Sequence, residues 1–269
     1  MNSEILQRNN VKVTGNPAAT EWLVMLHGFG TDQKVWSKML PAFEHRYRIV
    51  LLDHLGARSA EQGVDMPKAH QHYDLHGFAA DVVDILNALE ISKATLVGHS
   101  AGGMIGMLAG LRQPGLFSRQ VLIGSSPRYI NDNGYVGGFT KQILGEIHLA
   151  ILNNYQVWTM GFAADALQNK DDPADIQYFV DNLKAIPQAI LLKTLISIFE
   201  SDCRPQLGRV NTPTLIIQAH YDPIVPGEVA HYMRQHIAGS QLRVIETSGH
   251  LPHLTAPQVV SQAMIDFGI

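Results

Sequence analysis

A serine flanked by glycines is the feature of this sequence best suited to chemistry. Ser100 lies in the pattern Gly-x-Ser-x-Gly, after an apolar run at residues 94–97 and before a segment whose apolar residues recur at helical spacing. A strand can turn into a helix this sharply only where side chains at the corner are small, as at Gly98 and Gly102. The pattern predicts a nucleophile beside a helix N-terminus, where free N–H groups favour negative charge. A glycine-rich turn without chemistry is the alternative.

Two later loops offer the partners that a serine nucleophile needs. A hydroxyl is a weak nucleophile at neutral pH, so a histidine must take its proton and a carboxylate must orient that histidine. Asp222 follows an apolar run at residues 214–219, and His250 follows another at residues 242–246. Both loops come after predicted strands, and the order Ser, Asp, His suits this arrangement. The sequence therefore predicts a triad of Ser100, Asp222 and His250.

Each assignment has a competitor. Asp222 precedes a proline and could simply form a turn. His99 and His253 compete with His250 as the base. The glycine before His250 permits a close backbone approach, which favours His250. We expect His253 to pack or hydrogen-bond locally and His99 to line the floor of the pocket.

The tetrahedral intermediate of acyl transfer needs two N–H donors for its negative oxygen. The N–H of Ala101, directly after the nucleophile, is the first candidate. The second is expected in the loop after the apolar run at residues 22–26, where we choose the N–H of Phe29. A simple turn at the end of that strand is the alternative for residues 27–28.

Length and composition fit one large α/β domain. The chain has 269 residues, of which 46% are hydrophobic, and this is enough for a large core. A net charge of −4, from 20 basic and 24 acidic residues, offers no cationic surface, so no nucleic-acid partner is expected. The single cysteine, Cys203, fits a reducing compartment. With no apolar leader and no run of roughly 18 apolar residues, we expect a cytoplasmic protein without membrane association.

Three histidines lie close together in the sequence at His70, His72 and His76, near a polar stretch at residues 61–73. Such a group could indicate a metal site. No carboxylate or cysteine stands at ligand spacing beside them. The prediction is a surface loop, with no metal and no cofactor.

Predicted strands and helices alternate over the first half of the chain, which indicates a mostly parallel sheet wound on both faces. The expected strands lie at residues 11–14, 22–26, 49–52, 94–97 and 120–124, and the expected helices at residues 33–43, at 78–89 with Asp74 as cap, and after Ser100.

The alternation stops after residue 125. Four helical patterns then follow without a strand, at residues 140–152, 154–164, 172–183 and 187–199. Strands are expected again at residues 214–219 and 242–246, and helices at residues 227–236 and 257–267. A helical block in this place is typical of a cap over the strand ends, where open α/β sheets bind ligands.

Several segments resemble the α/β-hydrolase superfamily, and more narrowly one of its subfamilies. These segments are residues 27–33, 97–100, 104–106, 126–132, 137–139 and 249–254. Together they resemble the subfamily of bacterial RsbQ-type stress-signalling hydrolases and plant strigolactone and karrikin receptors. The resemblance implies the α/β-hydrolase fold and the same triad and oxyanion donors. It also implies a hydrolase core at residues 1–125 and 206–269, with a four-helix lid at residues 126–205 inserted after the sixth strand.

The resemblance also implies a function. Members of the subfamily slowly hydrolyse small esters or butenolide-like lactones, and several are receptors whose lid engages a protein. We therefore expect a serine hydrolase of a small apolar ester or lactone, with a ligand-responsive signalling protein as the alternative. The expected pocket lining is Phe29, His99, Trp158, Phe162, Phe179, Leu195 and Phe199. Aromatic residues at helical spacing are equally typical of an ordinary core.

Two departures from the family pattern bear on this expectation. In the motif at residues 53–59, Arg58 stands where the superfamily carries its second glycine, so that loop is expected to differ in shape. Residues 101–103 read Ala-Gly-Gly where the plant receptors carry Val-Ser-Ala, which favours the bacterial side. A haloalkane dehalogenase would need an acid at Ser100 and is excluded, whereas a cofactor-free haloperoxidase or a carbon–carbon bond hydrolase keeps the same triad and stays open.

Overall fold

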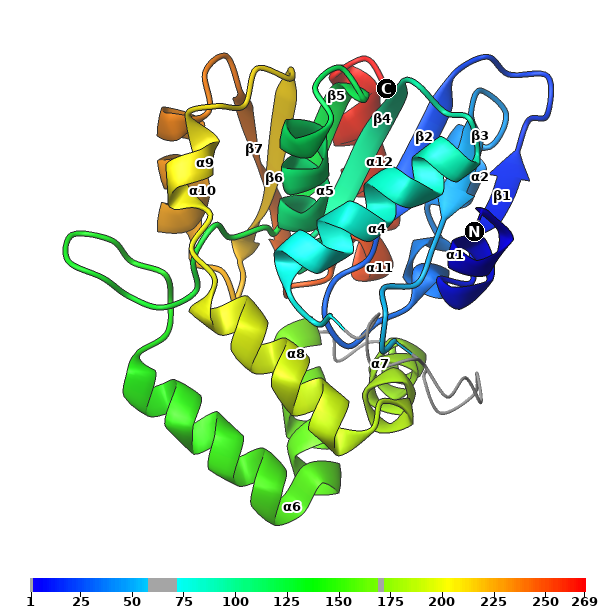
Figure 1. Cartoon of the computed structure of the whole chain (residues 1–269). Helices are drawn as coiled ribbons and strands as arrows, with labels where there is room; N and C mark the ends of the chain where they lie inside the picture. Colours follow the sequence, from blue (N-terminus) through cyan, green and yellow to red (C-terminus); the bar gives the residue numbers. More distant parts are fainter. Residues whose placement is uncertain (1, 58–71, 169–171) are drawn as a thin grey trace.

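A mostly parallel sheet organises the computed structural model, which describes residues 2–57, 72–168 and 172–269. Within these residues the sheet has seven strands in the order β1-β3-β2-β4-β5-β6-β7 (Figure 1). Only the edge strand β1 (Lys12–Gly15) is antiparallel, to β3 (Arg48–Leu51). The other strands are β2 (Trp22–Leu26), β4 (Ala94–His99), β5 (Phe117–Ile123), β6 (Thr214–Tyr221) and β7 (Gln241–Ser248). The predicted sheet is confirmed.

Helices cover both faces of this sheet. Figure 1 shows α4 (Leu75–Ala88) and α5 (Ala101–Arg112) in front of the strands, with α11 (Pro252–Thr255) and α12 (Pro257–Asp266) behind them. All six residues of the central strand β4 are buried, as expected for a strand covered on both sides. The remaining helices of the core are α1 (Asn2–Arg8), α2 (Leu40–Phe43), α9 (Arg204–Leu207) and α10 (Gly227–His236).

The cap predicted for one helix is present, whereas another predicted helix is divided in two. The cap expected for α4 is present, because the side chain of Asp74 accepts a hydrogen bond from the N–H of Gly77. The single helix expected at residues 33–43 is wrong: a 3-10 turn, η1 (Gln33–Trp36), is followed by the separate helix α2. Pro41 lies in the first turn of α2, where its missing N–H is tolerated, whereas in a longer helix it would interrupt the bonding.

Three of the helices between β5 and β6 in the described chain form a layer at one end of the sheet, below it in Figure 1. They are α6 (Lys141–Leu167), α7 (Pro173–Ala185) and α8 (Gln188–Glu200). Asn154 has non-helical backbone angles and divides α6 into two, so the four helical patterns are found. The insertion follows the fifth strand of the described chain, not the sixth as expected. The exact division into core and lid at residues 125 and 205 stays a prediction.

The described helices were also compared with the length and hydropathy of a membrane span. Individually, each is too short or too polar to cross a bilayer. Taken together, α7 and α8 are long and apolar enough for a membrane span by length and composition alone, but the pair is bent by 105°.

Candidate active site

The turn between β4 and α5 carries Ser100 in a strained backbone conformation. Ser100 has φ of 54° and ψ of −125°, a region that residues with a side chain rarely adopt. A Cβ added at Gly98 would lie 2.5 Å from the Cα of Gly103, and one added at Gly102 would lie 2.4 Å from two backbone oxygens of β2 and its loop. The structure therefore contains the sharp strand-to-helix turn that the glycines indicated.

Three loops bring Ser100, His250 and Asp222 together as a chain of hydrogen bonds. The Ser100 hydroxyl donates to Nε2 of His250 at 2.9 Å, and Nδ1–H of His250 donates to Oδ2 of Asp222 at 2.8 Å. The three residues are only 5%, 6% and 9% exposed. The other carboxylate oxygen of Asp222 accepts from the N–H groups of Ile224 and Val225. These bonds leave Oδ2 aimed at the imidazole.

The backbone of His250 is held from two sides. Its carbonyl accepts a hydrogen bond from Nε2–H of His99 at 2.8 Å, and its N–H donates to the carbonyl of Ala166 at 2.7 Å. His99 belongs to the core, whereas Ala166 lies near the end of the inserted helix α6. A Cβ at Gly249 would lie 2.2 Å from the carbonyl oxygen of Leu167, so only glycine permits this approach. The insertion thus contacts the triad directly.

His99 and His253 form a buried ring stack behind His250. The ring of His99 lies 4.8 Å from that of His250 and 4.2 Å from that of His253, which also packs on Trp36. Burial lowers the pKa of His253 to about 3 and holds the pKa of His99 well below its usual value. Both rings are therefore neutral at physiological pH. Among the described residues, only His250 offers an imidazole nitrogen to the hydroxyl of Ser100.

The expected oxyanion donors lie on the two chain segments that border Ser100. Ala101 is the first residue of α5, where backbone N–H groups have no partner within the helix. The loop that carries Phe29 runs against the nucleophile, since a Cβ on Gly28 would lie 3.1 Å from the Cβ of Ser100. Within residues 2–57, 72–168 and 172–269, neither N–H donates a hydrogen bond. Both are free to bind a negative oxygen.

An apolar cavity opens onto Ser100 between the core and the inserted helices. Six of the seven side chains expected to line it do so, namely Phe29, His99, Phe162, Phe179, Leu195 and Phe199. Trp158 lies one layer further out, with its ring stacked 5.0 Å from that of Phe162. The wall also includes Tyr129, Ile198, Ile224 and Leu251, which the sequence did not single out.

A second apolar cavity lies on the other side of Phe29. It shares Phe29 and Ile198 with the first cavity. Ala101, one of the expected oxyanion donors, is part of its wall, together with Leu55, Phe78, Ile105, Ile186 and Ile190. His54 also lines this cavity, and burial holds the pKa of its imidazole well below the usual value, so the ring is neutral.

Sequence reasoning missed one polar group at the nucleophile. The hydroxyl of Tyr129 lies 3.1 Å from Oγ of Ser100, and its ring stacks on Phe199 at 5.2 Å between centroids. Tyr129 is 2% exposed. It lies in the segment after β5, at the same sheet edge as Ser100 and within the family-like segment 126–132, and these are the signals that could have identified it.

Other candidate groups of the sequence have structural partners or lie outside the described residues. Nε2–H of His72 donates to Oδ2 of Asp81 at 2.9 Å. His70 and Arg58 lie outside the described residues. Within the described ranges, no group of three or more histidine, cysteine or acidic side chains could hold a metal ion.

Comparison with known proteins identifies relatives along nearly the whole chain. A family model described as "Alpha/beta hydrolase family" matches residues 23–263. "Strigolactone esterase RMS3" of Pisum sativum is 38% identical over 98% of each chain. "Karrikin insensitive 2 receptor CA" of Petunia hybrida is 36% identical over 96% of this chain and 95% of its own. The solved structure of a hydrolase from Oleispira antarctica superposes with a TM-score of 0.91 at 28% identity, over 99% of this chain and 96% of the other. The fold and the resemblance predicted from the sequence are confirmed.

Proposed function

Because the chain belongs to the α/β-hydrolase family, we propose that it is a serine hydrolase that cleaves small apolar esters or lactones through an acyl-enzyme. The observation that carries this proposal is the hydrogen-bond chain from Ser100 through His250 to Asp222. A buried carboxylate, an imidazole and a hydroxyl in this order are the parts needed to activate a serine.

In the first step, Nε2 of His250 takes the proton of Ser100 while Oγ attacks the ester carbonyl carbon. Asp222 holds Nδ1–H, which keeps Nε2 free as the acceptor and stabilises the imidazolium that forms. The carbonyl oxygen becomes negative and is bound by the N–H groups of Phe29 and Ala101. Preorganised donors of this kind typically contribute about 10²-fold or more to turnover each.

In the second step, the bond between the carbonyl carbon and the leaving oxygen breaks. Nε2–H of His250 gives its proton to that oxygen, and the acyl group stays on Ser100. Water, deprotonated by the same imidazole, then attacks the acyl carbon and releases the acid. With a lactone, the leaving oxygen stays attached to the acyl chain, so hydrolysis opens the ring.

The walls of the cavity support an uncharged substrate. Among the described residues that line the Ser100 cavity, none carries a Lys, Arg, Asp or Glu side chain. Phenylalanine rings from both the core and the inserted helices surround the nucleophile, so apolar groups gain from burial there. The second cavity beyond Phe29 is also lined mostly by apolar side chains. A relative named as a strigolactone esterase fits this substrate class.

The test is labelling of the nucleophile. The purified protein is expected to react with a fluorophosphonate at Ser100 and to hydrolyse p-nitrophenyl acetate. Ser100→Ala should lose both properties, since the residual rate without the nucleophile is typically lower by about 10⁶-fold. Ser261→Ala, which alters a buried serine of α12, is the matched control and should keep both. Full activity in Ser100→Ala would refute the mechanism.

A ligand-responsive signalling protein is the second candidate function. The observation that favours it is the hydrogen bond from the N–H of His250 to the carbonyl of Ala166, because it connects the triad to the inserted helix α6. A covalent change at Ser100 or His250 can therefore reach the lid surface, where a protein partner would bind. The Petunia relative named as a karrikin insensitive receptor supports this alternative.

Hydrogen exchange of α6 tests the second candidate. Modification of Ser100 by a fluorophosphonate should change the exchange of amides across Lys141–Leu167, with Ser100→Ala as the unreactive control. Unchanged exchange in α6 would remove the structural basis for signalling while leaving hydrolysis intact. A cytoplasmic location belongs to both candidates as a proposal, supported by the one buried, unpaired thiol of Cys203.

A further inference from the structure

Two groups contact the oxygen of the nucleophile, and the triad uses only one of them. Nε2 of His250 lies 2.9 Å from Oγ of Ser100 and takes its proton. The hydroxyl of Tyr129 lies 3.1 Å from the same oxygen. Because the proton of Ser100 points to His250, the remaining lone pairs of Oγ accept a hydrogen bond from the phenol O–H.

The phenol of Tyr129 is a permanent donor. Burial raises its pKa well above the ordinary tyrosine value, the hydrogen bond with Ser100 lowering it only in part. The group is therefore neutral and protonated throughout the range in which serine hydrolases work. Since Tyr129 is 2% exposed and lies among mostly apolar side chains, its O–H acts in a low-dielectric environment.

Hydrogen bonds within the segment after β5 fix the backbone around Tyr129. The carbonyl of Tyr129 accepts from the N–H of Phe139 at 3.1 Å. The carbonyl of Arg128 accepts from the hydroxyls of Ser126 and Tyr135 at 2.7 and 2.9 Å. These bonds hold the segment that carries the phenol.

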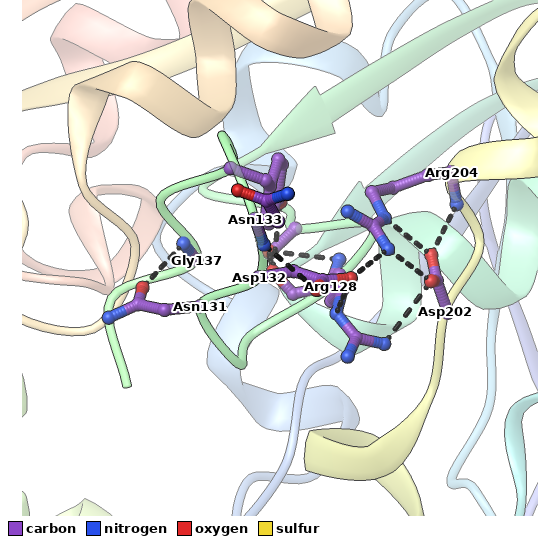
Figure 2. Close-up of polar contacts among 9 residues, drawn as sticks. Arg128, Asn131, Asp132, Asn133, Gly137, Asp202 and Arg204 are labelled. Atoms are coloured by element: carbon purple, nitrogen blue, oxygen red, sulfur yellow. Dashed lines mark hydrogen bonds and ion pairs between the residues drawn. The ribbon is translucent and has the colours of Figure 1, made fainter. Parts of the chain in front are cut away.

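A charge cluster then ties this segment to the returning chain. Figure 2 shows its four members, Arg128, Asp132, Asp202 and Arg204. Arg204 bonds Asp202 at 2.7 Å and Asp132 at 2.8 Å, and Arg128 bonds Asp202 at 3.2 Å. The cluster joins the segment after β5 to the segment after α8. The segment that carries the phenol is thus held in place by the segment after α8, where the chain leaves the insertion.

We propose that Tyr129 is a further catalytic residue, whose O–H donates a hydrogen bond to the leaving oxygen when the tetrahedral intermediate breaks down. The inference rests on the proposed function. The leaving oxygen and Oγ are bonded to the same carbon in the intermediate, so a donor that reaches Oγ also reaches the leaving oxygen after a small shift. The leaving oxygen lies on the side of the intermediate that faces His250, because that imidazole must deliver the proton to it.

The step balances without another reactant. The bond from the acyl carbon to the leaving oxygen breaks, and its electron pair goes to that oxygen. The proton comes from Nε2–H of His250, while Tyr129 keeps its own proton and stabilises the developing negative charge. A hydrogen bond to a charged group is worth about 1.5–3 kcal/mol, or about 10- to 100-fold in rate. The contribution grows with the basicity of the leaving oxygen.

The test is the leaving-group dependence of Tyr129→Phe. A series of acetate esters from p-nitrophenyl through phenyl and trifluoroethyl to ethyl acetate spans good to poor leaving groups. The variant should lose less than about threefold in kcat/KM on p-nitrophenyl acetate, and about 10- to 100-fold on ethyl acetate. The control is Tyr155→Phe, which removes a hydroxyl that donates to the carbonyls of Leu183 and Ile186 within the lid. It should follow the wild-type dependence.

Titration with fluorophosphonate gives rates per active site, so an unfolded fraction does not affect the comparison. An equal loss on every ester would mean that Tyr129 only orients Ser100 and would overturn the proposal, as would an unchanged or higher rate on ethyl acetate. Failure of the hydrolase function itself is distinguishable, because then the wild type would neither bind the fluorophosphonate nor cleave any ester.

Discussion

The two walls of the Ser100 cavity are built on different physical principles. The core wall contains directional hydrogen bonds between defined partners, as from Ser100 to His250 and from His250 to Asp222. The lid wall consists of ring contacts, for example between Phe162 and Phe179 at 5.8 Å. Bond-making needs atoms placed within tenths of an ångström, whereas binding an apolar group needs only shape and area. We therefore expect changes in the core wall to affect rate, and changes in the lid wall to affect affinity.

After loss of the Ser100 hydroxyl itself, the largest effect should come from Asp222→Asn in the core wall. The amide cannot hold His250 in the required tautomer, so kcat on p-nitrophenyl acetate should fall by about 10⁴-fold with little change in KM. Asp84→Asn, at an exposed position of α4, is the matched control and should behave as the wild type. A loss of less than tenfold would show that the carboxylate is dispensable.

Buried neutral histidines on the core side should produce a pH dependence of stability. The pKa values of His54, His99 and His253 are lowered in the folded state by burial, and that of His253 to about 3. Below pH about 6.5 the unfolded chain binds protons at these positions and the folded chain does not, so stability falls as the pH drops. Each group contributes about 1.4 kcal/mol per pH unit below that point, and nothing above it.

Urea unfolding between pH 7 and pH 5 measures this slope. His253→Phe should flatten it by about 1.4 kcal/mol per pH unit, because one proton is no longer taken up on unfolding. The slope, and not the absolute stability, is the quantity to compare, since the larger ring also alters packing against Trp36. An unchanged slope would mean that His253 is protonated in the folded protein.

Phe162→Ala in the lid wall should have a smaller effect, on substrate affinity and not on rate. Without the ring, a bound substrate buries less apolar surface against the lid. KM for an apolar ester should therefore rise about tenfold, while kcat stays within about threefold. Met160→Ala, at a position 57% exposed on the same helix, should leave both constants unchanged. A fall in kcat with constant KM would contradict the expectation that the lid wall affects affinity and the core wall affects rate.

The smallest effect concerns the charge cluster that joins the segment after β5 to the segment after α8. Asp202→Asn removes the carboxylate shared by Arg128 and Arg204 and should lower the unfolding free energy by about 1 kcal/mol, or Tm by about 2–4 °C. Glu21→Gln, whose partner Arg46 is also exposed, serves as the comparison and should shift Tm by less than about 1 °C. Equal shifts in the two variants would show that the cluster behaves as an ordinary surface pair.

The sequence predicted the core wall better than the lid wall. The glycines around Ser100 predict its sharp turn, the places of Asp222 and His250 after predicted strands predict that they lie near it, and the structure joins the three by hydrogen bonds. The helices of the lid were also predicted, including the separation of residues 140–152 from residues 154–164. Which of their aromatic side chains face the cavity was harder to predict, because a ring on a helix face packs equally well in an ordinary core. Trp158, for example, was expected in the cavity lining but lies one layer further out, against Phe162.

Local patterns in the chain determined the strands, the nucleophile turn and the order of the catalytic side chains, because backbone sterics and hydrophobic periodicity act over a few residues. Tertiary structure alone decided that the phenol of Tyr129 reaches Ser100, that Ala166 holds His250, and that a second cavity lies beyond Phe29. These contacts join residues tens of positions apart. Their geometry depends on how the inserted helices pack on the sheet edge, and no short segment encodes that.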